Sequence, residues 1–158
     1  MRLVSSVVFG LSLTLFAAVR PASAQDAQAR FWDASISGDT AVLHKAVLDG
    51  AVVDSLDQRR SPNGRRALNW AAFNNRVDAI KLLLSLKAPI DGVNVTGFTA
   101  LHHAAESGSL EAAKALLDAG ANTMLAAANG MTAAEVARAR GNDQIAALIE
   151  AAPKKVVK

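Results

Sequence analysis

The clearest alternation of apolar and polar positions lies at residues 97–121, where two short apolar-periodic segments are separated by a polar break at residues 107–109. The stretch ends on a second break, of small residues, at residues 120–121. Its first glycine, Gly97, has counterparts at equal distances before and after it, at Gly64 and Gly130. A fixed period of this length is typical of stacked repeat arrays. The pattern therefore predicts pairs of short antiparallel helices that stack along the chain.

Extending the period in both directions divides the chain into four repeats. They are expected at about residues 26–57, 61–93, 94–125 and 126–152. One helix pair alone cannot bury its apolar stripe, so neighbouring pairs bury it together. Between the first and second repeats the register slips by four residues, and the extra residues fall within 55–63, a segment rich in turn formers. A long loop between these two repeats is expected.

The N-terminus has the pattern of a secretory signal peptide at residues 1–24, because Arg2 precedes an apolar stretch and a small-x-small sequence follows at residues 22–24. Cleavage after Ala24 is expected, with export to the bacterial periplasm preferred and secretion from the cell as the alternative. An uncleaved membrane anchor is the competing interpretation, but the apolar stretch is short for a full span. Residues 153–158 form a basic tail that is expected to be disordered.

The composition fits tightly stacked helices better than a β-sandwich, because 51% of the residues are apolar but only 4% are aromatic. Paired alanines such as Ala104 and Ala105 would let helix backbones approach closely. The absence of cysteine excludes disulfides, thiolate catalysis and cysteine-ligated zinc. Removal of Arg2 and Arg20 with the signal peptide leaves 15 of the 17 basic residues against 14 acidic ones. This near-neutral charge gives no case for nucleic acid as a partner.

Repeat three carries the sequence Gly-x-Thr-Ala-Leu-His-x-Ala-Ala, followed by x-x-Gly-x-Leu-Glu, Leu-Leu and Gly-Ala-Asn. The residues are Gly97, Thr99, Ala100, Leu101, His102, Ala104, Ala105, Gly108, Leu110, Glu111, Leu116, Leu117, Gly120, Ala121 and Asn122. This pattern resembles the ankyrin repeat, and over about residues 27–150 the chain resembles small exported bacterial ankyrin repeat proteins. The resemblance implies an all-α ankyrin-repeat solenoid of about four stacked helix-turn-helix repeats with projecting β-turn fingers. It also implies a general role in binding other proteins, with no catalytic residue and no cofactor.

By this resemblance, Thr99 caps the first helix of repeat three and His102 hydrogen-bonds nearby loop backbone. Repeat two departs from the pattern, since Arg66 and Asn69 stand at the positions that correspond to Thr99 and His102. A helix cap is therefore expected to be missing. Lys87 also replaces a glycine, which should cost about 1 kcal/mol if the backbone geometry is kept. We expect repeat two to be the least stable internal unit.

In ankyrin-like arrays, partners meet the fingers and the exposed face of the first helix of each repeat. Carried over by position, this implies nine candidate partner-binding residues: Arg65, Trp70, Phe73, Asn74, Phe98, His103, Glu106, Met131 and Arg140. Aromatic and methionine side chains exposed on one face would form a binding patch, because the aromatic types are enriched at interface hot spots. Phe73 is expected to be the most exposed. The alternative is that Trp70 and Phe98 fold inward and cover contacts between repeats.

A basic cluster surrounds the long loop and either docks on an acidic protein or anionic envelope surface or is simply solvated; its members are Arg59, Arg60, Arg65 and Arg66. Adjacent residues on a helix point about 100° apart, so His102 and His103 are not expected to chelate a metal. No Ser-His-Asp order, paired-carboxylate motif or phosphate-binding loop stands in a plausible setting.

The leading hypothesis is a non-catalytic protein-protein interaction module of the bacterial envelope. It is expected to be a monomer that binds neither nucleic acid nor membrane beyond the signal peptide, and a periplasmic enzyme is a candidate partner. Two alternatives of the same fold stay open: an inhibitor or immunity protein that blocks a toxin or enzyme, and a secreted effector that binds a host protein. An enzyme is the remaining alternative.

Overall fold

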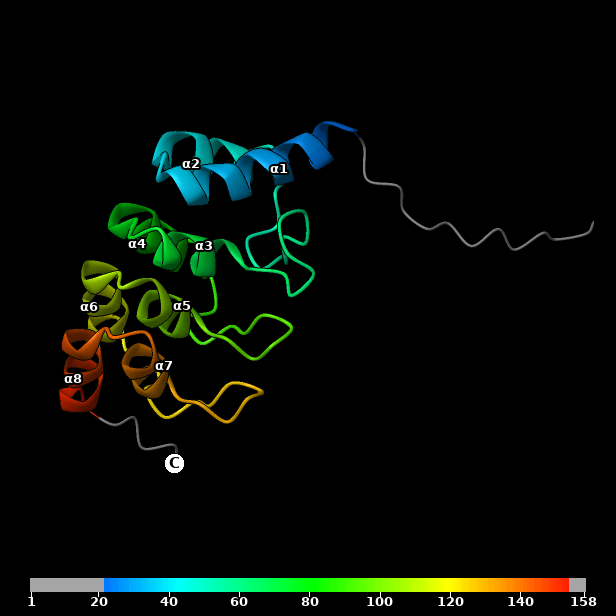
Figure 1. Ribbon diagram of the computed structural model, residues 1–158. Coiled ribbons are helices and arrows are strands. Elements are labelled where there is room, and N and C mark those ends of the chain that lie inside the picture. Colours follow the sequence, from blue (N-terminus) through cyan, green and yellow to red (C-terminus); the bar gives the residue numbers. More distant parts are fainter. Residues whose placement is uncertain (1–21, 154–158) are drawn as a thin grey trace, which may run out of the picture.

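The computed structural model describes residues 22–153, and this part of the chain forms eight α-helices and no β-strand. The helices are α1 (Ala22–Ser37), α2 (Thr40–Leu48), α3 (Ala67–Phe73), α4 (Val77–Ser85), α5 (Ala100–Ser107), α6 (Leu110–Asp118), α7 (Ala133–Ala139) and α8 (Asp143–Ala151). Consecutive helices form hairpins, and the hairpins stack in chain order (Figure 1). The predicted fold class, an all-α solenoid of stacked helix-turn-helix repeats, is confirmed.

The hairpins place their helices in two rows. The odd-numbered helices contact one another in sequence order along an inner row, and the even-numbered helices do so along an outer row. Loops project beside the inner row, before α3, α5 and α7 (Figure 1). We call them the first finger (residues 54–66), the second finger (residues 91–99) and the third finger (residues 124–132).

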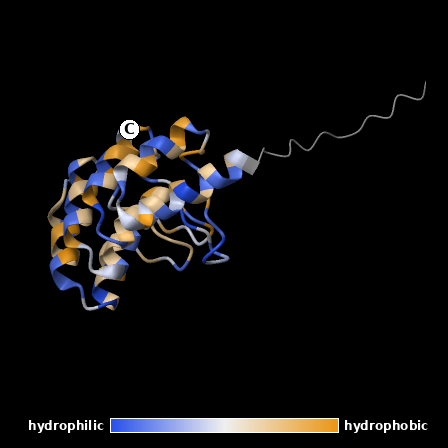
Figure 2. Cartoon of the chain, turned by 90° about the horizontal axis from the view of Figure 1, so that it is seen from above, coloured by the Kyte–Doolittle hydropathy of each residue, from blue (hydrophilic) through white to orange (hydrophobic). Residues whose placement is uncertain are grey.

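Small residues at matching positions let the inner helices approach closely. Ala71, Ala104 and Ala137 recur at the repeat period in α3, α5 and α7, and each is fully buried. Leu68 and Leu101 belong to the same core cluster. Figure 2 shows apolar and polar positions interspersed along the helices. The apolar stripes of successive hairpins thus join into one core that runs the length of the stack.

The first helix of repeat three is capped as expected. Thr99 Oγ1 accepts a hydrogen bond from the backbone N–H of His102, and His102 Nδ1 accepts one from the backbone N–H of Thr99 at 3.3 Å. His102 Nε2 lies 3.1 Å from the backbone oxygen of Met131. Because a carbonyl oxygen can only accept, Nε2 carries the proton and Nδ1 is the acceptor. His102 therefore ties α5 to the third finger.

Repeat two lacks this arrangement. Arg66 makes no side-chain capping hydrogen bond at the start of α3, so the missing cap is confirmed. Asn69 Nδ2 donates to the backbone oxygen of Phe98 at 3.1 Å, in the same way as His102 in repeat three. Its Oδ1, however, is buried with no partner among the described residues. Lys87 keeps the left-handed backbone of the glycine it replaces, with a φ of 66°. The low stability of repeat two stays a prediction with these three physical causes.

The slip in register is a longer first finger, as expected. Backbone hydrogen bonds of 2.8 and 3.1 Å join Asp57 and Arg65 across its base. In the second finger, the N–H of Asn94 donates to the oxygen of Phe98 at 3.0 Å and closes a shorter loop. Backbone hydrogen bonds also link each finger to the next. The fingers therefore form a continuous ledge beside the inner helices.

Residues 1–21 and 154–158 lie outside the described part of the chain, so the signal peptide and the basic tail stay predictions. Helix α1 begins at Ala22 and therefore contains the predicted cleavage point after Ala24. The first core residue of α1 is Ala27. Within residues 22–153, no helix is long and apolar enough to cross a membrane.

Candidate functional site

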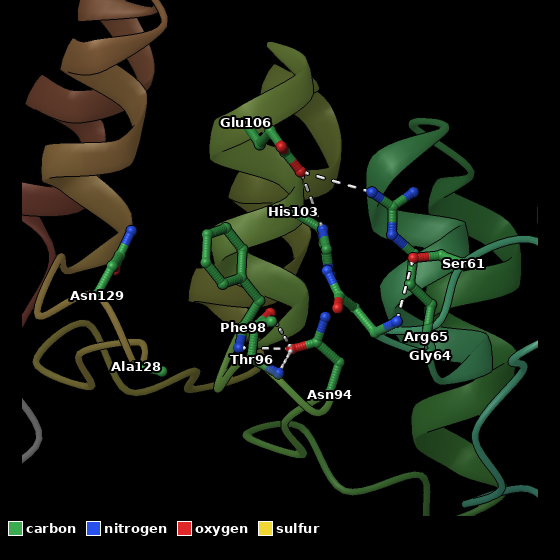
Figure 3. Close-up of a pocket in the computed structure, with 11 residues that line it drawn as sticks. Ser61, Gly64, Arg65, Asn94, Thr96, Phe98, His103, Glu106, Ala128 and Asn129 are labelled. Atoms are coloured by element: carbon green, nitrogen blue, oxygen red, sulfur yellow. Dashed lines mark hydrogen bonds and ion pairs between the residues drawn. The ribbon is translucent and has the colours of Figure 1, made fainter.

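A pocket of about 480 Å³ lies where the three fingers meet α5 (Figure 3). Its lining residues are Ser61, Asn63, Gly64, Arg65, Asn94, Thr96, Phe98, His103, Glu106, Ala128 and Asn129. The first finger, the second finger with α5, and the third finger each contribute, so three repeats build it. The pocket lies on the surface where the resemblance to ankyrin repeats implied a partner.

Arg65 projects from the base of the first finger and lies over two aromatic rings. Its guanidinium carbon is 4.6 Å from the ring centroid of Trp70 and 4.3 Å from that of Phe73. Such cation–π contacts hold the side chain in place. The Arg65 side chain is 18% exposed. Burial lowers the pKa of Arg65, and the Glu106 carboxylate opposes this effect. The guanidinium stays charged, because arginine does not deprotonate in proteins.

Glu106 connects the repeats electrostatically. Its Oε2 lies 3.2 Å from Nδ1 of His103 and 3.6 Å from Nη2 of Arg65, while its Oε1 lies 3.0 Å from Nη2 of Arg140. The hydrogen bond from His103 lowers the pKa of Glu106, and the charges of Arg65 and Arg140 lower it further against the effect of burial. Glu106 is therefore ionised and draws together side chains from repeats two, three and four.

His103 is buried between aromatic rings, with 3% of its surface exposed. Its ring centroid is 5.4 Å from that of Phe98 and 6.4 Å from that of Phe73. Burial lowers the pKa of His103, against the hydrogen bond to Glu106, so the imidazole is neutral. It donates Nδ1–H to Glu106 (Figure 3), which leaves Nε2 as an acceptor. This Nε2 has no hydrogen-bond partner in the described part of the chain.

Seven of the nine candidate residues meet at the pocket or directly behind it. Arg65, Phe98, His103 and Glu106 line it, Trp70 and Phe73 support Arg65, and Arg140 holds Glu106. Asn74 and Met131 have other contacts. The side-chain amide of Asn74 donates to the backbone oxygen of Trp70 at 2.9 Å, and Met131 packs against the core. His102 and His103 bond to different partners, and residues 22–153 contain no cluster of three His, Asp or Glu side chains that suits a metal ion.

The aromatic side chains lie deeper than an open binding patch requires. Trp70 is only 8% exposed, in agreement with the inward alternative. Phe73, expected to be the most exposed, is half-buried because the Arg65 guanidinium lies over its ring. Phe98 is half-buried as well and packs against the core. Trp70 therefore follows the inward alternative, while Phe73 and Phe98 stay partly exposed and form the support and the wall of a polar pocket.

Sequence reasoning missed Asn94, which shapes the second finger. Its Oδ1 accepts hydrogen bonds from the backbone N–H of Thr96 at 3.0 Å, the hydroxyl of Thr96 at 2.9 Å and the backbone N–H of Phe98 at 2.8 Å. These bonds set the turn that places Phe98 against α5. An asparagine that opens a loop is a signal for such a turn, and this signal would have identified the residue.

The arginines of the first finger do not form an open basic patch. The ion pairs are Arg59 with Asp57 (2.8 Å) and Asp33 (3.0 Å), Arg60 with Asp33 (3.2 Å), and Arg66 with Asp54. Three of the four arginines thus neutralise carboxylates on the finger itself or on α1 and brace the finger against the stack. The fourth, Arg65, is the one that lines the pocket. This pairing weakens the interpretation of the cluster as a docking patch.

Comparison with known proteins identifies the family. A model described as ankyrin repeats in three copies matches residues 31–127 and, in an overlapping second match, residues 94–157. These matches cover most of the chain. The chain belongs to the ankyrin repeat family. Ankyrin repeats generally mediate protein–protein interactions, and ankyrin repeat domains are generally non-catalytic.

Several curated proteins are similar to part of this sequence. The ankyrin repeat domain-containing protein SAT10 of Stachybotrys chartarum is 34% identical over 106 residues, which are 67% of this chain and 5% of that protein. The ankyrin repeat and SOCS box protein 16 of Homo sapiens is 35% identical over 112 residues, or 70% of this chain and 24% of that protein. The palmitoyltransferase AKR1 of Lachancea kluyveri is 33% identical over 97 residues, which are 61% of this chain and 13% of that protein. The matches span a quarter or less of each relative, so the similarity concerns the repeats alone.

Proposed function

We propose that this chain is a non-catalytic module of the bacterial envelope that holds one partner protein through the pocket and the fingers around it. The observation that carries the proposal is the pocket, in which three successive repeats combine arginine, aromatic and amide side chains around about 480 Å³. Arginine and aromatic residues are the types that dominate binding energy at protein interfaces. Membership of the ankyrin repeat family supports a protein as the ligand.

The surface around the pocket is held in place before any partner arrives. Glu106 links Arg65 and Arg140 across three repeats, and backbone hydrogen bonds join each finger to the next. A surface that is already ordered loses little conformational entropy on association. This supports stable capture of one partner over transient contact with many.

The location in the envelope is supported by the signal-peptide pattern at residues 1–24. Cleavage after Ala24 would shorten α1 at its start and leave its first core residue, Ala27, in place. The chain also contains no cysteine and so needs no disulfide to fold after export. A periplasmic enzyme is accordingly the first class of partner to test.

The test is affinity capture from an envelope extract of the source organism with residues 25–158 as bait. Phe98→Ala removes a wall of the pocket, and Arg65→Gln removes its charge while keeping Phe98. Leu48→Ala is the control, because Leu48 is 74% exposed on the outer helix α2. We expect a stoichiometric protein that is retained by the wild type and the control and lost by both pocket variants, each folded by circular dichroism. Equal retention by all four baits would refute the assignment.

Two further measurements separate the parts of this proposal. The mass of the exported form tests cleavage after Ala24, and a chain that retains residues 1–24 contradicts export by this signal. The activity of a captured enzyme, measured with and without the module, distinguishes an accessory protein from an inhibitor. Abolished activity at a one-to-one ratio would favour the inhibitor.

A further inference from the structure

We propose that the pocket receives an acidic side chain, aspartate or glutamate, from an exposed loop of the partner protein, and that Arg65 is its receptor. This inference rests on the proposed function and names the chemistry of the partner at that same site. Three observations carry it: the unused hydrogen-bond donors of Arg65, the charge balance around Glu106, and the backbone N–H groups of the fingers, which are already hydrogen-bonded within the protein.

Arg65 has hydrogen-bond donors to offer. A guanidinium carries five N–H groups in a rigid fork that matches a carboxylate. The nearest carboxylate oxygen, of Glu106, lies 3.6 Å away, and no acceptor in residues 22–153 lies within hydrogen-bond distance. The three neighbouring arginines of the first finger have carboxylate partners at hydrogen-bond distance. Arg65 is instead held over Trp70 and Phe73, so its fork is fixed in the wall of the pocket.

The charges around the pocket favour a monoanion. Arg65 and Arg140 carry two positive charges and Glu106 carries one negative charge, while burial keeps His103 neutral. Glu106 is satisfied at 3.0 Å by Arg140 and at 3.2 Å by His103, which leaves the charge of Arg65 the least compensated of the set. One excess positive charge matches a carboxylate. The Glu106 carboxylate in the same pocket would repel a phosphate dianion about twice as strongly as a carboxylate monoanion at the same distance.

The remaining lining groups fit a side chain more than a chain terminus. A C-terminal carboxylate is usually captured by a group of free backbone N–H donors. In the second finger those donors are already used: Val95 donates to the oxygen of Asn63, Gly97 to the oxygen of Asn94, and Thr96 and Phe98 to Oδ1 of Asn94. In the other two fingers the backbone N–H groups of Gly64 and Ala128 are also used. The pocket therefore offers mainly side-chain donors, namely Arg65 and the amide groups of its asparagines, beside the apolar wall of Phe98.

The test is a titration of ¹⁵N-labelled residues 25–158 followed through the Arg65 Nε–Hε signal. The probe is the capped peptide Ac-Gly-Glu-Gly-NH₂, matched against Ac-Gly-Gln-Gly-NH₂, the same glutamine peptide with a free C-terminal carboxylate, and inorganic phosphate. We expect a saturable shift with the glutamate peptide and none with the capped glutamine peptide. A response to the capped glutamine peptide equal to that of the glutamate peptide would overturn the proposal. Tighter binding of phosphate or of the free carboxyl terminus would overturn it as well.

Three variants give the test a direction. Arg65→Gln should weaken binding of the glutamate peptide about tenfold, equivalent to about 1.4 kcal/mol. Glu106→Gln removes the competing negative charge but keeps an oxygen for His103, so binding should strengthen at least threefold. Arg60→Gln is the control, because Arg60 pairs with Asp33 outside the pocket, and should change nothing. Weaker binding of the glutamate peptide to Glu106→Gln would contradict the charge argument and overturn the proposal.

The peptide titration and the capture experiment test the two proposals independently. A saturable response of Arg65 to the glutamate peptide without any captured protein would support the acidic-group site and refute the proposed envelope partner. Suppose instead that capture of a protein depends on Phe98 but Arg65 does not respond to the glutamate peptide. This result would support the function as a binding module and refute the proposed acidic ligand. Arg65→Lys keeps the charge but loses the planar fork, and should lie between the wild type and Arg65→Gln. A dispersed spectrum of each variant shows that it is folded.

Discussion

Acid should destabilise this protein through two buried histidines before its carboxylates begin to titrate. Burial lowers the pKa of His102 and of His103, so both are neutral in the folded protein. In the unfolded chain they return to a pKa near 6.5. As the pH falls below that value, the unfolded chain binds protons that the folded chain does not. Stability that is fully present above about pH 6.5 is therefore lost as the pH falls toward the folded-state pKa values.

The size of the effect follows from proton linkage. Between pH 7.0 and pH 5.5, one histidine that stays neutral in the folded protein removes at most roughly 1.3 kcal/mol from the free energy of unfolding. His102 and His103 together remove at most roughly 2.5 kcal/mol. Carboxylates with a lowered pKa, such as Glu106, add to the loss mainly below about pH 5. The interval above pH 5.5 therefore isolates the histidines.

The assay is urea denaturation at pH 7.0, 6.5, 6.0 and 5.5, with His103→Gln and His102→Asn compared with the wild type. Asparagine is the natural choice at position 102, because Asn69 makes the matching backbone hydrogen bond in repeat two. Each variant is expected to be less stable at pH 7.0, but its loss of stability on acidification should shrink by up to roughly 1.3 kcal/mol. His44 is exposed and common to all three proteins. A pH dependence unchanged in both variants would refute the reasoning.

Three further substitutions test how the repeats are built. Thr99→Ala should destabilise by about 1 kcal/mol through loss of the helix cap, and Thr99→Ser should restore most of it; equal losses in urea denaturation would contradict the cap. Ala104→Leu should cost about 1–3 kcal/mol by overpacking a fully buried seam, so an unchanged melting temperature would contradict the placement of that face. Lys87→Gly should raise stability by about 0.5–1 kcal/mol. The backbone of Lys87 is left-handed, with a φ of 66°, as is that of Gly50 and Gly120 at the matching positions of the neighbouring repeats. Relief of this strain should exceed the entropy that glycine adds to the unfolded chain. A lower melting temperature for Lys87→Gly would show that this strain is absent.

The fold was predictable from the sequence because its determinants are local and recur. Ala71, Ala104 and Ala137 occupy the same place in three consecutive helix pairs, so one spacing assigns the whole core face. The capping unit of Thr99 and His102 lies within a single turn of the chain. Even the irregularities of repeat two followed from residue type, since Lys87 stands where the geometry needs a left-handed residue.

The candidate site was predictable only as a face of the molecule. Repeat spacing places positions in columns, but it does not say whether Trp70 turns inward or whether a guanidinium covers Phe73. Those outcomes depend on side-chain rotamers and on contacts between repeats. The pairing of Glu106 with Arg65 and Arg140 joins residues of three different repeats, and no local pattern announces it.

The same limit explains the arginines of the first finger. The sequence shows four of them close together, which favours a basic patch. The carboxylates that neutralise them include Asp33, which lies on α1 in the preceding repeat. Only the stacking of repeats brings this charge to Arg59 and Arg60. Charge counted along the chain therefore overstated the charge that the surface presents.

At Arg65, the departure of repeat two from its neighbours has a structural consequence. Arg65 precedes Phe98 by one repeat period and occupies the matching place at the base of its finger. Phe98 lies against the ring of His103, which follows Trp70 by the same period, and the guanidinium of Arg65 lies over Trp70. Either side chain covers the inner helix of its own repeat, so packing alone does not require an arginine here. What the arginine adds to that packing is a charge with unused donors in the wall of the pocket, and this addition is what the proposed contact with an acidic side chain uses.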